Sequence, residues 1–524
     1  MLNNAIVIMF DSLRFDYVGC YGNNWIKTPN MDRLAREGVL FENSYTEGLP
    51  TIPCRRAMHT GRYTLPNTGW EPLYMDDTTI ADLCWGKPID SALIFDCPMY
   101  RQPKFGYTRG FDKVFFTHGH EMDHYFYEND KLFHLNPEDY MTDSVREGAS
   151  KQYGETVVNS QIDEITSYLK QCQHWKSEDD RYVARTVSKA IEYLENVDRN
   201  KQFFLWIDSF DPHEPWNPPS LYMKFPCPYD PDYKGKDDFL PFMGDCDGVY
   251  DERTLQHIRA LYAECITVCD TQLGKLMDAI HRLGFEENTL LMMVSDHGEP
   301  LGYGKDGHGI MRKVRPWPYE ELSHTPLIIR GPGLPAGTRV KGFVQSVDVA
   351  PTVCDWLGIG VHPDMQGFSL LPLARGEVDK VRDFAISGYH KYSAAIYTED
   401  WVFVHWTANE RHTAGFNADA VRSVYANAQH LESFKFLNVT GSNDEPKFEE
   451  VNDAFARHKA AATIDGEEQW TCTPGAAATV PEMDELYDRH NDPYQLNNVI
   501  TQHPDIAEDL LMTLNQFMRK IKRA

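Results

Sequence analysis

Short, continuous apolar runs recur along the chain, and each is followed by polar turn residues and then by helical spacing. Five of them stand out, at residues 5–10, 92–95, 203–207, 289–295 and 325–330. Strands buried on both faces are apolar throughout, whereas strands with one solvated face alternate between apolar and polar residues. The pattern therefore predicts an α/β fold in which a mostly parallel sheet lies between layers of helices.

Two longer segments add to this picture. Residues 252–284 carry apolar side chains at close to a 3.6-residue period, which predicts one long amphipathic helix ending near Gly284. Residues 112–180 are rich in His, Tyr, Asp and Glu and are only weakly periodic. We interpret them as an insertion over one end of the sheet, where open α/β folds commonly place a substrate lid.

The pattern changes after residue 375. Shorter alternating stretches at 393–397 and 401–406 predict a small antiparallel sheet, and residues 504–522 predict a closing helix. We therefore expect a catalytic domain at 1–375 and a smaller C-terminal α+β domain at 376–524. An apolar edge of the closing helix would pack on its own domain or mediate formation of a homo-oligomer.

Composition narrows the choice of function and location. The 51 Lys+Arg residues against 78 Asp+Glu give a net charge of −27, which argues against nucleic-acid and anionic-membrane partners. No apolar run approaches the roughly 20 residues of a membrane span. The N-terminus lacks the features of a signal peptide, and the 11 cysteines show no CxxC spacing. We expect a cytoplasmic protein with reduced thiols; a periplasmic protein whose signal had been removed would look the same.

Two of the predicted strands end in residues suited to binding a metal ion. The first ends at Asp11-Ser12, and the fourth at Asp296-His297. Ligands of this fold class gather at strand ends, and carboxylates with one histidine suit a divalent ion such as Mn²⁺, Ca²⁺, Mg²⁺ or Zn²⁺. Taken alone, an Asp after a strand is more commonly a helix cap or a turn residue.

Several longer motifs, in a fixed order along nearly the whole chain, resemble the sulfatases of the alkaline phosphatase superfamily. They lie at residues 11–45, 211–216, 295–302, 347–352 and 485–493. The resemblance implies an alkaline-phosphatase-like α/β/α sandwich with a mostly parallel central sheet, plus a smaller C-terminal domain. It also implies hydrolysis of a small-molecule sulfate or phosphate ester at a metal-bound nucleophile.

The nucleophile motif departs from the family pattern. Sulfatases have Cys/Ser-x-Pro-x-Arg, whose first residue is oxidised to formylglycine, whereas this chain has Thr51-Ile52-Pro53-Cys54-Arg55. Pro53 and Arg55 fix the register, so the first position is Thr51. A secondary carbinol cannot give an aldehyde, so we expect no formylglycine. A metal-bound threonine can still attack an ester, as in phosphodiesterases of the superfamily. The alternatives are that Thr51 only caps a helix, or that Cys54 is the nucleophile.

The resemblance assigns roles to further residues. Asp11, Thr51, Asp296 and His297 would hold one metal ion. Arg55 would neutralise the nucleophile or an ester oxygen, and His213 would protonate the leaving oxygen or hold a nonbridging one. Lys313 would bridge nucleophile and ester, with Arg312 and Arg315 competing for that assignment. His308 and Ser12 are further candidates for substrate contact. Asp208 and Asp211 are loose candidates for a second ion.

Several departures favour phosphorus over sulfur as the attacked atom. Residues 95–101 lack the Gly-Lys-x-His stretch that clamps sulfate in many sulfatases, and a single Asp11 replaces an Asp-Asp pair. Phosphonate monoester hydrolases of the family also lack this clamp, and their metal site likewise contains an Asp-His pair. We therefore expect a hydrolase of phosphate diesters, monoesters or phosphonate monoesters. A sulfatase working without formylglycine, a phosphoryl-headgroup transferase and an inactive binding protein are the alternatives.

Overall fold

The computed structural model describes residues 3–101, 105–120, 123, 131–133, 135–313, 317–406, 463–464, 467–468, 481 and 483–522. Its centre is an eight-stranded sheet of order β11-β2-β10-β7-β1-β5-β3-β4. The strands are β1 (Asn4–Phe10), β2 (Val39–Tyr45), β3 (Ile89–Phe95), β4 (Lys113–Phe116), β5 (Gln202–Ser209), β7 (Thr289–Ser295), β10 (Leu327–Arg330) and β11 (Thr338–Gln345). Only β10 runs antiparallel to its neighbours. The five predicted strands and their mostly parallel arrangement are confirmed.

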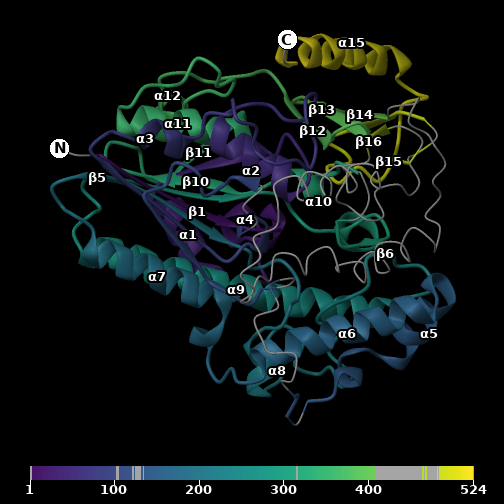
Figure 1. The fold of residues 1–524 in the computed structure, drawn as a ribbon. Coiled ribbons are helices and arrows are strands. Elements are labelled where there is room, and N and C mark those ends of the chain that lie inside the picture. The colour runs from purple at the N-terminus through teal and green to yellow at the C-terminus, as the bar shows by residue number, and fades with distance from the viewer. Residues whose placement is uncertain are drawn as a thin grey trace, which may run out of the picture.

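Helices cover both faces of this sheet (Figure 1). In β1, Ile6, Ile8 and Phe10 belong to one apolar core, and Ala5, Val7 and Met9 belong to another. The first core contains side chains of α1 (Pro29–Glu37), α7 (Tyr182–Asn196) and α9 (Glu252–Arg282). The second contains those of α2 (Thr51–Thr60), α3 (Ile80–Cys84) and α11 (Val349–Leu357). The strand is therefore buried on both of its faces, as an α/β/α sandwich requires, and this explains why its sequence is apolar throughout.

The long predicted helix is α9, and its ends have local causes. The side chain of Asp251 accepts a hydrogen bond of 2.7 Å from the backbone N–H of Thr254 and so caps the first turn. Gly284 follows the last turn at φ +72°, a conformation that glycine adopts without strain. Across the described part of the chain, none of the helices combines the length and apolarity needed to cross a bilayer.

The segment predicted as an insertion begins within the sheet. Residues 113–116 form β4, which pairs in parallel with β3, and the helices α5 (Asp143–Tyr153) and α6 (Glu155–Cys172) follow. Side chains of both helices enter the core on the α9 side of the sheet. Residues 113–116 of the predicted insertion therefore belong to the central sheet. The bounds of the insertion stay a prediction. A lid role for the two helices stays a prediction.

The C-terminal part contains the predicted antiparallel sheet, of order β12-β13-β14-β17. Its strands are β12 (Ala385–Tyr389), β13 (Ser393–Tyr397), β14 (Trp401–Trp406) and β17 (Glu485–Asp488), and α15 (Pro504–Ile521) packs on it. Leu514 of α15 is buried in this core beside Phe403. The helix therefore packs its apolar edge on its own sheet, the first of the two arrangements expected. The domain boundary at 375/376 stays a prediction.

Short elements connect these parts. They are α4 (Pro98–Arg101), α8 (Pro219–Met223), α10 (Glu320–Ser323), α12 (Leu371–Ala374), a three-stranded sheet of β6 (Gly244–Asp245), β9 (Ile310–Met311) and β8 (Leu301–Gly302), and the pair β15 (Thr463–Ile464) and β16 (Glu467–Glu468). The β8–β9 hairpin is the element that leads to Lys313.

Candidate active site

The strand register brings the two candidate metal-ligand motifs together. In the parallel pair β1 and β7, Phe10 lies opposite Ser295, so the next residues of the two strands, Asp11 and Asp296, leave the same edge of the sheet. One ligand atom from each of Asp11, Asp296 and His297 lies within 4.8 Å of the others, and all three side chains are buried. The arrangement follows directly from two neighbouring strands that end at the same level.

Hydrogen bonding fixes the orientation of His297. Its Nδ1 lies 2.8 Å from the backbone carbonyl oxygen of Gly298. A carbonyl only accepts, so Nδ1 carries the proton, and in the neutral ring Nε2 carries the lone pair. Burial lowers the pKa of His297 to about 4. The lone pair at Nε2 therefore lies on the side of the two carboxyl groups, where it can accept a hydrogen bond or bind an ion.

The two buried carboxyl groups of Asp11 and Asp296 share one cationic partner, Nη1 of Arg55. Burial and the charge of Asp11 raise the pKa of Asp296. Burial also opposes ionisation of Asp11, but Arg55 and the neighbouring cationic groups hold its pKa below the usual value. Asp11 Oδ2 is buried and receives no hydrogen bond among the described residues, although Arg55 Nη1 lies 2.8 Å away. Two carboxylates and one imidazole form a donor set that fits a divalent cation.

Thr51 lies next to this group. It is the first residue of α2, and its buried hydroxyl Oγ1 is 3.1 Å from His297 Nε2. Because Nε2 carries the lone pair, the hydroxyl donates to it. The cap position of α2 belongs to Pro50, and no side-chain cap bond forms there. Thr51 is therefore not the helix cap, and the positive end of the α2 dipole lies beside its hydroxyl.

Cys54 lies one helical turn further along and makes different contacts. Its thiol donates to the backbone carbonyl of Asp296 at 2.9 Å and accepts from the Thr46 hydroxyl at 2.8 Å. Burial raises the pKa of Cys54 well above the usual value for a thiol. Since nucleophilic attack by cysteine needs the thiolate, this environment argues against Cys54 as the nucleophile.

We therefore expect Cys54→Ala to keep kcat/KM within about threefold of wild type, while losing about 1–2 kcal/mol of stability, the usual range for deleting a small buried group. Steady-state kinetics and denaturant unfolding check this. A loss of turnover greater than a hundredfold in a folded protein with normal metal content would instead favour the thiol.

Arg55 is engaged by three carboxylates. Its Nη1 pairs with Asp11 and Asp296 at 2.8 and 2.5 Å, and its Nη2 and Nε bind Asp208 at 2.8 and 3.1 Å. Asp208 is the penultimate residue of β5, the other neighbour of β1. The guanidinium thus organises the carboxylates at three strand ends. Direct contact between Arg55 and an ester oxygen stays a prediction.

Lys313 approaches the site from the β8–β9 hairpin. Its Nζ lies 3.2 Å from Glu299 Oε2 and 3.6 Å from Glu214 Oε2. Burial disfavours its charge, but the two glutamates outweigh this and raise the pKa of Lys313 above its usual value. Arg312, the competing residue, forms an ion pair with Glu214. Arg315 lies outside the described residues.

His213 is buried and stacks on Phe210, with the ring centroids 4.0 Å apart. Its Nδ1 lies 2.7 Å from the backbone carbonyl of Glu214 and must donate to it. Burial lowers the pKa of His213 to about 3. The neutral ring therefore presents an acceptor at Nε2. This tautomer favours holding a donor or taking a proton over the predicted protonation of a leaving group.

The two weaker candidates for substrate contact make protein contacts instead. His308 lies 2.7 Å from Glu321 Oε1 through Nδ1 and 3.0 Å from the Gln495 carbonyl through Nε2, so both ring nitrogens have partners. The Ser12 hydroxyl donates to Asp11 Oδ1 at 2.8 Å. Asp211 pairs with Arg181 on the α7 side of the sheet. Substrate contact by His308 or Ser12 stays a prediction.

Two acidic residues at the site had no predicted role, Glu214 and Glu299, although both lie inside recognised motifs. The sequence signal that could have identified them is an acidic residue close to a candidate site residue: Glu214 follows His213, and Glu299 lies two residues after His297. The structure adds that both carboxyl groups are buried.

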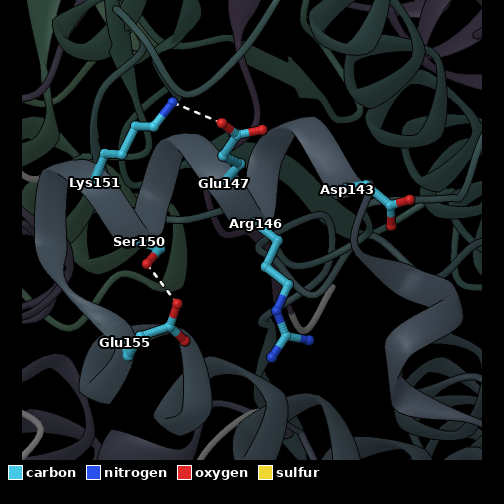
Figure 2. Close-up of a pocket in the computed structure, with 6 residues that line it drawn as sticks. All are labelled: Asp143, Arg146, Glu147, Ser150, Lys151 and Glu155. Carbon is cyan, nitrogen blue, oxygen red and sulfur yellow. Dashed lines mark hydrogen bonds and ion pairs between the residues drawn. The ribbon is translucent and has the colours of Figure 1, made fainter.

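A surface hollow also lies on α5 and α6, away from these residues (Figure 2). It is lined by Asp143, Arg146, Glu147, Ser150, Lys151 and Glu155. Lys151 pairs with Glu147 at 2.7 Å, but both side chains are about 70% exposed, so the pair contributes little. We interpret this surface as a solvated helix face.

Comparisons with known proteins identify the family of this chain. The sulfatase family profile matches residues 3–359, and that of the N-sulphoglucosamine sulphohydrolase C-terminal region matches residues 307–412. An arylsulfatase of Clostridium perfringens is 27% identical over 75% of this chain and 82% of its own length. A multifunctional alkaline phosphatase superfamily protein of Trinickia caryophylli is 28% identical over 71% of this chain and 77% of its own.

Among solved structures, the phosphonate monoester hydrolase of Agrobacterium radiobacter superposes with a TM-score of 0.64 at 20% identity. The match covers 98% of this chain and 96% of that enzyme, which confirms the predicted fold. The family profile spans well over half of the chain, and the buried aspartate–histidine group lies at the strand ends as the motifs predict. The chain therefore belongs to the sulfatase family of the alkaline phosphatase superfamily and is a hydrolase acting on ester bonds.

Proposed function

We propose that this protein is a metal-dependent hydrolase of phosphorus esters and that Thr51 is its nucleophile. The observation that carries the proposal is the position of the Thr51 hydroxyl, 3.1 Å from Nε2 of His297 and at the N-terminus of α2. Asp11, Asp296 and His297, with Thr51 itself, would hold one divalent ion. Bound there, the ion would favour the ionised hydroxyl and polarise the ester.

The chemistry of Thr51 differs from that of formylglycine. Its Oγ1 would attack phosphorus after losing its proton to solvent, and the bond from phosphorus to the leaving oxygen would break. The covalent phosphothreonine left behind has no hemiacetal that could eliminate. Water must therefore attack it, giving the free hydroxyl and the phosphate or phosphonate product. His213, whose neutral ring presents an acceptor at Nε2, would accept a hydrogen bond from that water and orient it.

The surroundings of the nucleophile support a phosphorus ester. Many sulfatases have a cationic clamp after the strand that corresponds to β3. At that place the present chain has Cys97 and Tyr100, both buried. The Tyr100 hydroxyl is engaged with His59 at 2.8 Å. Lys313 would then be the cation that contacts nonbridging oxygens. A sulfate ester is the second candidate substrate, because the relative named an arylsulfatase is 27% identical over 75% of this chain.

Nitrophenyl esters distinguish the two candidates. We expect kcat/KM for a phosphodiester or phosphonate monoester to exceed that for the sulfate ester by more than about tenfold, equivalent to 1.4 kcal/mol of transition-state binding. The panel includes a phosphate monoester, and release of acid and alcohol is measured so that transfer to another acceptor would be seen. A reversed ratio would establish sulfate hydrolysis. Metal binding without turnover of any ester would favour the inactive binding protein.

Lys313→Ala should lower kcat/KM by about 10²–10³-fold, the typical effect of removing one preorganised charge contact in a site without bulk water. The loss should be smaller for esters with good leaving groups only if Lys313 acts on the leaving oxygen. Lys305, exposed on the preceding turn, provides the matched control, since Lys305→Ala removes the same charge without touching the site. Retention of more than about a tenth of wild-type activity would remove Lys313 from the mechanism.

A further inference from the structure

We propose that Glu299 and Glu214 are positioning residues for catalysis, which orient the Lys313 ammonium from two sides, Glu299 through a hydrogen bond and Glu214 through its charge, and leave N–H donors for the ester. The inference rests on the proposed function, since it assumes that Lys313 acts on the ester. Glu299 follows β7, and Glu214 follows β5, so the two carboxylates come from different strand ends. Lys313 arrives between them from a third element, β9.

Glu299 has a rigid backbone. Its carbonyl oxygen accepts a hydrogen bond of 3.2 Å from Arg14 Nη1, and the N–H of Gly298 donates to the Leu322 carbonyl at 2.8 Å. A Cβ added at Gly298 would lie 2.0 Å from the Glu321 carbonyl oxygen, so this close approach requires glycine. The side chain of Glu299 is fully buried. Its Oε2 accepts from Lys313 at 3.2 Å, and its Oε1 has no partner within the described residues.

Glu214 is held by a different cation. Arg312 forms an ion pair with Glu214 Oε1, and Glu214 Oε2 lies 3.6 Å from Lys313 Nζ. The neighbouring residues Arg312 and Lys313 therefore have different contacts. Arg312 holds the carboxylate of Glu214, and Lys313 extends to the site. An ammonium group has three N–H donors on a flexible stem. Glu299 accepts one of these donors, and the charge of Glu214 attracts the ammonium from a second direction, so the position of the group is defined and N–H donors remain for the ester.

A purely structural ion cluster would show the same contacts, so the test must separate orientation from stability. If the glutamates act through Lys313, their removal costs nothing further once Lys313 is absent. If they only stabilise the fold, their effect is the same with and without Lys313. A double-mutant cycle measures this difference directly. Glu264 provides a matched control, because this buried carboxylate on α9 bonds to Ser220 and makes no contact with Lys313.

The experiment uses the full-length metal-loaded enzyme with a nitrophenyl phosphodiester or phosphonate monoester. Glu299→Gln keeps the size of the side chain and should lower kcat/KM about 10- to 100-fold, as expected for a displaced catalytic group. In the Lys313→Ala background the same change should cost less than about threefold. Glu214→Gln should behave in the same way, and Glu264→Gln should leave kcat/KM unchanged. Melting temperature and bound metal are measured for each variant.

Equal losses in both backgrounds would overturn the positioning role, as would full activity of Glu299→Gln and Glu214→Gln. If Glu299→Gln does not fold, Glu299→Asp and Glu214→Gln carry the cycle. A failure of the proposed function looks different. In that case the wild-type enzyme hydrolyses none of the esters, or Lys313→Ala is fully active. Either result would overturn the proposed function and the positioning role together. Active wild type, impaired Lys313→Ala and additive glutamate variants would overturn this inference alone.

Discussion

Thr51→Ala should lower kcat by at least about 10³-fold on every ester that the wild-type enzyme hydrolyses, because removal of a covalent nucleophile leaves only binding and charge stabilisation. The reacting oxygen would be lost while the metal-ligand group of Asp11, Asp296 and His297 stays in place. Stability should change little, since the Thr51 hydroxyl caps no backbone N–H of α2 and makes its contact with His297 alone among the described residues. Single-turnover kinetics and thermal unfolding check the two parts.

Two companion measurements make the result specific to Thr51. Thr51→Ser keeps a hydroxyl at the same position and should retain activity within about tenfold, whereas Thr51→Val keeps the shape and should be as inactive as Thr51→Ala. Intact-mass analysis of wild type after a brief reaction should show one added phosphoryl or phosphonyl group on the peptide that contains Thr51. Substantial turnover by Thr51→Val, or an adduct on another residue, would show that a different group attacks.

The residues of the candidate metal site could be predicted to lie together because their positions depend on local rules. Asp11 and Asp296 each follow a continuous apolar strand, and neighbouring parallel strands that end together bring such residues to one edge. The register of β1 against β7 then makes the aspartates neighbours. Long periodic helices such as α9 and α15 could also be predicted from the sequence, because their apolar spacing extends over many turns.

The rest depended on contacts between residues far apart in sequence. Asp208 and Arg55 are separated by 153 residues, and nothing local indicates that their side chains meet. β4 is four residues long and only partly buried, so its pattern was too weak to mark it as an edge strand. The resemblance named His213 and His308, but which ring nitrogen carries the proton depends on carbonyls and carboxylates that only the fold brings near.

Removal of divalent metal should abolish turnover and also lower the melting temperature. With no metal ion present, the buried carboxyl groups of Asp11 and Asp296 have only Nη1 of Arg55 as a shared cationic partner among the described residues. An ion that binds only the folded protein adds about 2.7 kcal/mol of stability at 100 times its Kd. Dialysis against a chelator, followed by titration with Mn²⁺, Ca²⁺, Mg²⁺ or Zn²⁺, should restore activity and melting temperature together, with one ion bound per chain.

The variant Asp296→Asn separates the ion from the general effect of chelation. It keeps the shape of the side chain but removes one ligand charge, so it should bind the ion at least tenfold more weakly, within the 10–100-fold range seen when metal-site contacts are altered. Its melting temperature without metal should rise relative to the apo wild type, because the repulsion from Asp11 is relieved. Opposite signs for stability with and without metal are expected only of a cation site. An Asp296→Asn protein whose melting temperature falls equally in both conditions would mean that the carboxylates serve Arg55 and the fold, with no ion between them.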